Sequence, residues 1–169
     1  MKNKLYIMSG IPGSGKSTFA KTYFPEAEYI SRDEVRFSLV GENEEYFSKE
    51  DEVYDLFIGK INLALREGKD VVADATHLNP KSRLKLLACL NFIPGDTQVN
   101  VIYMKVPLAE CIIRNENRKG TRSYVPSSVI IRMYKALKKP NFEECMGMID
   151  RIIIVDEHEH VRVIERGDT

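Results

Sequence analysis

The stretch from Gly10 to Thr18, Gly-Ile-Pro-Gly-Ser-Gly-Lys-Ser-Thr, constrains the fold of this chain more than any other feature. It matches the pattern G-x-x-x-x-G-K-[ST] in full, and an apolar strand candidate, Lys4 to Ser9, runs directly into it. Glycines let consecutive backbone N–H groups turn toward one anion, and the helix expected from Ser17 to Phe24 adds the partial positive charge of its N-terminus. A plain strand-to-helix turn would not need three glycines, a lysine and a serine. The sequence therefore predicts a loop that binds the phosphates of a nucleoside triphosphate.

The positions of this phosphate loop have expected roles. Lys16 is expected to reach the β- and γ-phosphates, and the hydroxyl of Ser17 is expected to ligate Mg²⁺. The residues expected to bind the nucleotide are Gly10, Pro12, Gly13, Ser14, Gly15, Lys16, Ser17 and Thr18.

Short β-rich runs alternate with helical patterns along the chain. Several runs are apolar on both faces, which is typical of a parallel sheet with helices on both sides, so we expect an α/β three-layer sandwich. The 169 residues show no internal repeat, low-complexity segment or linker, and we expect one domain, residues 1–169. The further expected strands are 29–31, 71–75, 99–106 and 149–155, the last paired with 161–164, and the further expected helices are 33–40, 79–90, 107–118 and 126–138.

A longer helix is expected from Ser48 to just before Gly68. Ser48 is a candidate N-cap with Asp51 three residues on, and Gly68 is a typical helix end. The apolar positions share one face at helical spacing and are expected in the core: Val53, Leu56, Phe57, Ile61, Ala64 and Leu65.

A charged cluster, Ser31-Arg32-Asp33-Glu34-Val35-Arg36, follows the second expected strand. Ligands collect at the carboxyl ends of strands in open α/β sheets, so Asp33 is expected on the same rim as the phosphate loop. Its carboxylate could accept a proton from an attacking hydroxyl, and Arg36, one turn on, could hold an anionic acceptor group. In the alternative, Asp33 caps the helix and Arg36 pairs with an acid at the surface.

The strand Val71 to Ala75 also carries an acid at its end. Asp74 is placed like the acid that helps to hold Mg²⁺ in phosphate-loop proteins; the alternative is an acid in a turn. His77 is expected to be a loop histidine, and the acidic segment around His158 and His160 is expected to be a solvated turn.

Arginines gather between Arg114 and Arg122. Four-residue spacing puts them on one face of a helix end, and Gly120 permits a hinge, so residues 114–125 are a candidate lid that brings Arg118 and Arg122 to the γ-phosphate. The alternative is a solvated basic helix end.

The formal net charge is zero, with 25 basic and 25 acidic residues, which disfavours a long non-specific DNA-binding face. The charge is divided, however: residues 114–139 carry a net charge of plus seven, and residues 42–55 carry minus six. A local basic entrance is enough for an enzyme that holds one strand end. No apolar run approaches the roughly 20 residues of a bilayer span, and the start does not look like a secretory signal, so we expect a cytoplasmic protein without membrane contact.

Taken together, these motifs resemble the kinase module of the polynucleotide 5′-hydroxyl kinase family. The resemblance covers about residues 4 to 140 and rests on four motifs in order: G-x-P-G-S-G-K-S-T from Gly10, S-R-D-x-x-R from Ser31, D-A-T-x-L-N-P from Asp74, and R-N-x-x-R from Arg114.

The resemblance implies an adenylate-kinase-like phosphate-loop fold and transfer of the γ-phosphate of ATP·Mg²⁺ to the 5′-hydroxyl end of DNA or RNA. It implies Lys16, Asp33 and Arg118 as catalytic residues, with Asp33 as general base, and Asp33, Arg36, Asp74 and Thr76 as substrate-binding residues. Ser17 and Asp74 would hold the metal, and Arg118 and Arg122 the donor phosphates. No obligatory protein partner is evident. Two alternatives stay open: a kinase for a small-molecule hydroxyl, and an ATP-binding switch protein that would not need Asp33.

Overall fold

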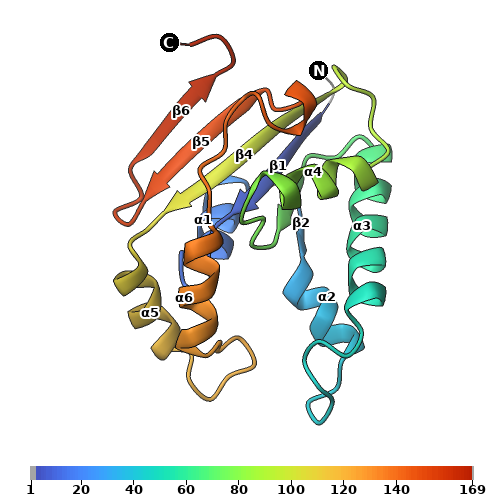
Figure 1. The fold of residues 1–169 in the computed structure, drawn as a ribbon. Coiled ribbons are helices and arrows are strands. Elements are labelled where there is room, and N and C mark those ends of the chain that lie inside the picture. Colours follow the sequence, from blue (N-terminus) through green and yellow to red (C-terminus); the bar gives the residue numbers. More distant parts are fainter. Residues whose placement is uncertain (1–2, 169) are drawn as a thin grey trace.

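The computed structural model describes residues 3–168 (Figure 1). Strands and helices alternate, as expected, and most bounds differ by one or two residues from the sequence-based ones. The elements in order are β1 (Asn3–Ser9), α1 (Lys16–Tyr23), β2 (Glu28–Ser31), α2 (Arg32–Leu39), α3 (Glu50–Arg66), β3 (Val71–Asp74), α4 (Pro80–Cys89), β4 (Thr97–Lys105), α5 (Leu108–Glu116), α6 (Ser127–Ala136), the short 3₁₀ helix η1 (Cys145–Gly147), β5 (Arg151–Asp156) and β6 (Val161–Glu165).

The described strands form one six-stranded sheet in the order β2-β3-β1-β4-β5-β6. Strands β1 to β5 pair in parallel, as the sequence predicts, whereas β6 runs antiparallel to β5. The reason is the short turn between β5 and β6, because a parallel pair needs a long crossover connection.

The two faces of the sheet are covered by different helices, which confirms the expected three layers. Leu5 and Ile7 of β1 pack with residues of α3 and α4, whereas Tyr6 and Met8 point the other way and pack with Phe19 of α1. This alternation follows from the two-residue period of a strand, and it makes β1 apolar on both faces.

Two expectations about α3 are wrong. Ser48 does not cap the helix, because α3 begins at Glu50 after Lys49, and no side chain caps it. Acidic residues in its first turn interact favourably with the helix dipole instead. Leu56 is 38% exposed and lies at the edge of the apolar stripe, while the other five predicted positions are buried. At 17 residues α3 is the longest helix described, and none of the described helices is long and apolar enough to cross a membrane.

The carboxyl ends of β1, β2 and β3 meet at one edge of the sheet, where α5 and α6 also lie (Figure 1). Ile11, just after β1, packs with Cys111 of α5 and Ile130 of α6. The predicted lid corresponds to the end of α5 and the connection to α6, with Gly120 at a φ of +91°. The fold therefore brings the motifs of the phosphate loop, α2, the end of β3 and the α5–α6 connection to one edge.

Candidate active site

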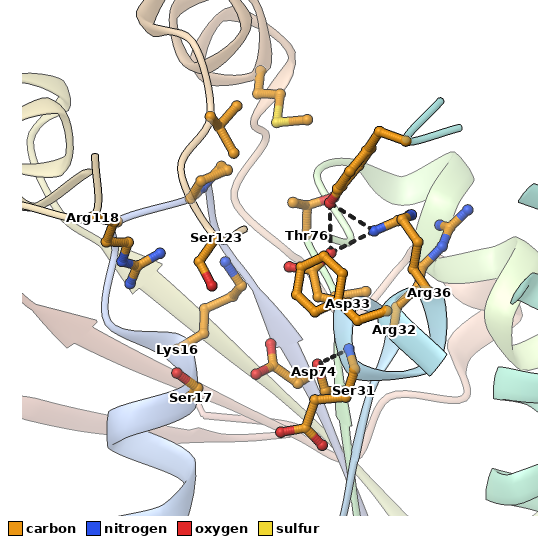
Figure 2. Close-up of a pocket in the computed structure, with 18 of the residues that line it drawn as sticks. Lys16, Ser17, Ser31, Arg32, Asp33, Arg36, Asp74, Thr76, Arg118 and Ser123 are labelled. Atoms are coloured by element: carbon orange, nitrogen blue, oxygen red, sulfur yellow. Dashed lines mark hydrogen bonds and ion pairs between the residues drawn. The ribbon is translucent and has the colours of Figure 1, made fainter. Parts of the chain in front are cut away.

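A cavity of about 580 Å³ opens at this edge of the sheet (Figure 2). Its walls come from the phosphate loop, α2, the end of β3 and the segment around α6. The predicted site residues that line it are Pro12, Gly13, Gly15, Lys16, Ser17, Asp33, Arg36, Asp74, Thr76 and Arg118. Gly10, Ser14, Thr18 and Arg122 are not among its lining residues.

The glycines of the phosphate loop are required by its shape. Gly13 and Gly15 have φ angles of +85° and +90°, which side chains rarely adopt. A Cβ on Gly13 would also lie 2.3 Å from the carbonyl oxygen of Cys111, so the loop packs directly against α5. Gly10 joins the start of the loop to the segment after β3, because its N–H donates to the carbonyl of Thr76 at 2.9 Å.

Lys16 is held inside the loop. Its Nζ donates to the carbonyl of Ile11 at 3.1 Å. Burial lowers the pKa of Lys16, and the carboxylates of Asp74 and Asp33 oppose this shift. A phosphate bound in the loop would therefore supply the negative charge that the buried ammonium lacks.

Asp74 and Ser17 form a candidate metal site. Asp74 is 7% exposed, burial raises its pKa, and the hydroxyl of Tyr29 donates to its Oδ2. Oδ1 of Asp74 and the hydroxyl of Ser17 are hard oxygen donors on one cavity, which suits Mg²⁺. Within residues 3–168 no group of three His, Cys, Asp or Glu is placed to hold a metal ion.

Asp33 projects from the first turn of α2 on the other side of the cavity. The expectation that Asp33 might instead cap the helix is wrong, because the hydroxyl of Ser31 accepts the N–H of Glu34 at 3.2 Å and caps it. The Asp33 side chain is 62% exposed, and its Oδ1 accepts from Arg36 at 2.5 Å and from the hydroxyl of Tyr46 at 3.0 Å. Its other oxygen, Oδ2, has no hydrogen-bond partner among residues 3–168, and Asp33 lines the cavity.

Arg36 is 5% exposed and fully engaged in the free protein. It binds both oxygens of Glu50, at 2.6 and 3.0 Å, and also bonds to Asp33 and to Tyr46. The alternative in which Arg36 pairs with an acid is therefore observed, but the pair is built into the cavity wall rather than the outer surface. Its guanidinium also lies 4.5 Å from the ring centre of Tyr46, in a cation–π arrangement.

The lining residues that the sequence did not predict include Tyr29, Tyr46 and Glu50, which contact the predicted site residues Asp74, Asp33 and Arg36. Glu50 also binds Arg32 at 3.0 Å and so joins both arginines of the S-R-D-x-x-R motif. Glu50 is one of seven acids in the run 42–55, and nothing in the sequence distinguishes it from the other six as the partner of the two arginines. The neighbouring aromatics Tyr46 and Phe47 within that polar run were the available signal for a ligand wall.

The arginines of the predicted lid do three different things. Arg114 supports the phosphate loop, since it bonds to the carbonyl of Ser14 at 3.3 Å and to Glu110 at 3.0 Å. Arg118 lines the cavity, and Figure 2 shows it on the opposite side from Asp33 and Arg36. Arg122 points toward α2, where it donates to the carbonyl of Val40 at 2.7 Å.

Beneath the cavity, Arg83 and His77 hold the loops together. Arg83 is fully buried and makes five hydrogen bonds: two to Glu144 and one each to Ser9, to the carbonyl of His77 and to that of Lys138. His77 Nδ1 bonds to the carbonyl of Met8 at 2.8 Å, and burial lowers its pKa to about 4. His77 is therefore a buried neutral histidine that joins β1 to the loop after β3.

A protein-family model described as an AAA domain matches residues 5–140 of this chain. Among curated proteins, L-seryl-tRNA(Sec) kinase of Methanococcus maripaludis is 29% identical over 164 residues. A protein assigned as a bifunctional polynucleotide kinase/RNA ligase of Autographa californica nuclear polyhedrosis virus is 30% identical over 165 residues. A chain of the solved Pnkp1/Rnl/Hen1 RNA repair complex has a TM-score of 0.68 at 23% identity, which shows the shared fold. The expected resemblance to polynucleotide kinases is thereby confirmed.

The chain corresponds to only part of each of these proteins. The matches cover 93%, 88% and 80% of this chain but 60%, 23% and 44% of the archaeal, viral and repair-complex proteins. The matched family region, by contrast, contains every predicted site residue.

Proposed function

Because the chain belongs to the AAA domain family, we propose that it is a kinase that transfers the γ-phosphate of ATP to the 5′-hydroxyl end of DNA or RNA. One observation carries this proposal: Asp33 shares a cavity with Lys16 and Ser17 and stands across from Arg118. A carboxylate opposite a phosphate loop suits a kinase, and an ATP-binding switch would have no use for it. The viral relative, whose name includes a polynucleotide kinase, supports the choice of acceptor.

On the donor side, backbone N–H groups of the phosphate loop and Lys16 would bind the β- and γ-phosphates. Mg²⁺, held by Ser17 and Asp74, would neutralise phosphate charge when bound. Arg118 would contact the γ-phosphate, where charge moves during the transfer. Residues 114–125 would act as a lid that closes over the donor, with Gly120 as its hinge.

On the acceptor side, the free oxygen of Asp33 would take the proton of the attacking hydroxyl. Arg36 and Tyr46 hold the other oxygen, so the carboxylate has a fixed orientation. Alignment of the hydroxyl with the phosphorus would then supply much of the rate enhancement.

The acceptor half of the cavity has the composition expected for a nucleotide. Phe37, Tyr46 and Phe47 line one part of it, and Val125, Val129 and Met133 also line it. Phe47 is 58% exposed although it is apolar. A flat nucleobase would be stabilised by such aromatic and apolar surfaces, whereas a sugar alone would gain little from them.

A second candidate is a kinase for another hydroxyl, such as a small molecule or the seryl group named for the archaeal relative. It would keep Lys16, Ser17 and Asp33 but would not need the aromatic surface. The discriminating experiment offers labelled ATP with a 5′-hydroxyl oligonucleotide, the same oligonucleotide with a 5′-phosphate, nucleosides, sugars and seryl-tRNA. Labelling of the 5′-hydroxyl oligonucleotide alone is expected. Labelling of a nucleoside, a sugar or seryl-tRNA without the oligonucleotide would contradict the proposal.

A further inference from the structure

A second cavity, of about 330 Å³, lies on the sheet beside the C-terminal end of α6. No residue lines both this cavity and the candidate active site. We call it the β4–β6 cleft, and define it by Tyr103, Lys105, Lys139, Ile154, Asp156 and Arg162.

The register of the sheet builds the floor of this cleft. Tyr103 of β4 is paired with Ile154 of β5, and Ile154 is paired with Arg162 of β6. Three neighbouring strands thus present an aromatic, an apolar and a cationic side chain in one row. Tyr103 is partly buried, and burial raises the pKa of its phenol, so the ring stays uncharged at neutral pH.

The rim of the cleft is fixed by the buried network beneath the active site. The N–H of Lys138 donates to the carbonyl of Leu78 at 2.8 Å, and its own carbonyl accepts from Arg83 at 3.2 Å. Lys139 is the next residue, so its backbone position is fixed by these two hydrogen bonds of Lys138. Figure 1 shows this segment after α6 running along the sheet toward η1.

The lining residues of the cleft carry a net positive charge, with three cations and one acid. Lys105, Lys139 and Arg162 are exposed, and none forms an ion pair with any described residue. Asp156 is the one acid among the lining residues, and it makes no ion pair with the three cations, because its Oδ1 accepts the N–H groups of His158 and His160 and its Oδ2 contacts the ring of His160. Three unpaired cations around an apolar floor with a tyrosine suit a flexible strand that carries phosphates and bases.

Helix α6 contributes residues to the active-site cavity, and the segment after it contributes Lys139 to the cleft. Val129 and Met133 of α6 line the active-site cavity, whereas Arg132 and Lys135 of the same helix are exposed and, within residues 3–168, have no ion-pair partner. The ten residues of α6 span about 15 Å, so a strand needs several nucleotides to extend along this helix. A strand whose 5′ end is at Asp33 could thus follow α6 to the cleft.

We propose that the β4–β6 cleft binds the single-stranded nucleic acid acceptor several nucleotides away from the 5′ end that reacts. Lys105, Lys139 and Arg162 contact backbone phosphates there, and a base stacks on Tyr103. This inference rests on the proposed function for the identity of the strand, but it makes a separate statement about length. Acceptors too short to reach the cleft therefore gain no affinity from its residues.

The test compares two acceptors, a dinucleotide with a 5′-hydroxyl and a single strand of about twelve nucleotides, which is long enough to reach the cleft. The variant is Lys105→Gln/Lys139→Gln/Arg162→Gln. The matched control, Lys60→Gln/Arg66→Gln/Lys81→Gln, removes the same charge from exposed positions on α3 and α4. Oligonucleotide binding is measured by fluorescence anisotropy across a salt series, and KM is measured for both acceptors and for ATP.

For the cleft variant we expect the affinity for the long strand to fall by about tenfold to a hundredfold at low salt, and the salt slope to shrink by about 2, because each lost phosphate contact contributes about 0.7. KM for the dinucleotide and for ATP should stay at wild-type values, as should all values of the control. Tyr103→Leu should weaken binding of the long strand, and Tyr103→Phe should not.

Several results would overturn the cleft assignment: unchanged long-strand affinity in the cleft variant, an equal loss in the control, or an equal loss for the dinucleotide. The proposed function fails separately. If the wild-type protein binds the long strand through the cleft but labels no 5′-hydroxyl, the cleft stands and the proposed reaction falls.

Discussion

The two sides of the active-site cavity treat their cations differently. On the phosphate-loop side, the ammonium of Lys16 has only the carbonyl of Ile11 as a hydrogen-bond partner among the described residues, and the guanidinium of Arg118 has none there. On the α2 side, Arg32 and Arg36 are both bound to Glu50, and Arg36 is also bound to Asp33. The two cations of the donor side therefore make no ion pair among the described residues and are available for a polyanion, whereas those of the acceptor side are already paired and orient one carboxylate.

Apart from the loss of the proposed base itself, the largest effect should come from removing a cation of the donor side. Arg118→Ala is expected to lower kcat about 10³-fold, the lower end for an arginine that stabilises a transferred phosphoryl group. Arg122→Ala is the matched control, because Arg122 binds the carbonyl of Val40 instead of lining the cavity. Steady-state kinetics of both variants check this, and a greater loss of kcat in Arg122→Ala would reverse the assignment.

Lowering the pH should destabilise the protein through His77, the buried histidine beneath the active-site cavity. The pKa of His77 is about 4 in the folded protein and about 6.5 in an unfolded chain, so between these values only the unfolded chain binds the proton. The neutral His77 therefore makes its full contribution to stability above pH 6.5. As the pH falls to 4, we expect the free energy of unfolding to drop by about 3 kcal/mol. Urea unfolding at several pH values measures this.

His77→Asn provides the control, since Asn tolerates the positive φ of this position and does not titrate. The variant should lose most of the decline between pH 6.5 and 4. An identical decline in the variant would show that other groups cause it.

Removing the charge balance of the acceptor side should have a moderate effect. Glu50→Gln leaves the buried Arg36 without its two-oxygen partner, and because Glu50 is partly exposed we expect a loss of about 1–3 kcal/mol in unfolding free energy. KM for the acceptor should change more than KM for ATP. The exposed neighbour Glu52 provides the control Glu52→Gln, whose stability should match the wild type. An equal change in both KM values would contradict the division of the cavity.

The smallest effect should come from the hydrogen bond between Tyr29 and Asp74. Tyr29→Phe removes the donor that fixes Oδ2 of Asp74, and losing such a support typically weakens metal binding about tenfold. Calorimetric titration of Mg²⁺ into the ADP complex measures this without turnover. Tyr23→Phe on α1 is the control, and equal affinities of the two variants would remove the role of Tyr29.

The order of the elements and the phosphate loop were predictable because local patterns determine them: two-residue alternation, helix signals, and glycines at positive φ. Asp33, Asp74 and Arg118 were predictable because each follows a strand or helix that ends at the same edge. The bond between Arg36 and Glu50 joins α2 to α3 across the loop between them, and no local pattern encodes it. Likewise, Ser48 has the right residue type for an N-cap, but α3 begins two residues later, at Glu50, with an acidic first turn.

The central claim is that Asp33 acts as the base for a hydroxyl bound opposite the phosphate loop. Single-turnover transfer from labelled ATP to a 5′-hydroxyl oligonucleotide tests it most directly, with wild-type protein and Asp33→Asn, each first shown to bind ATP equally. Asn keeps the size and the contact with Arg36 but cannot take the proton, so the rate should fall by about 10²- to 10⁴-fold. Transfer by Asp33→Asn at the wild-type rate would contradict the account.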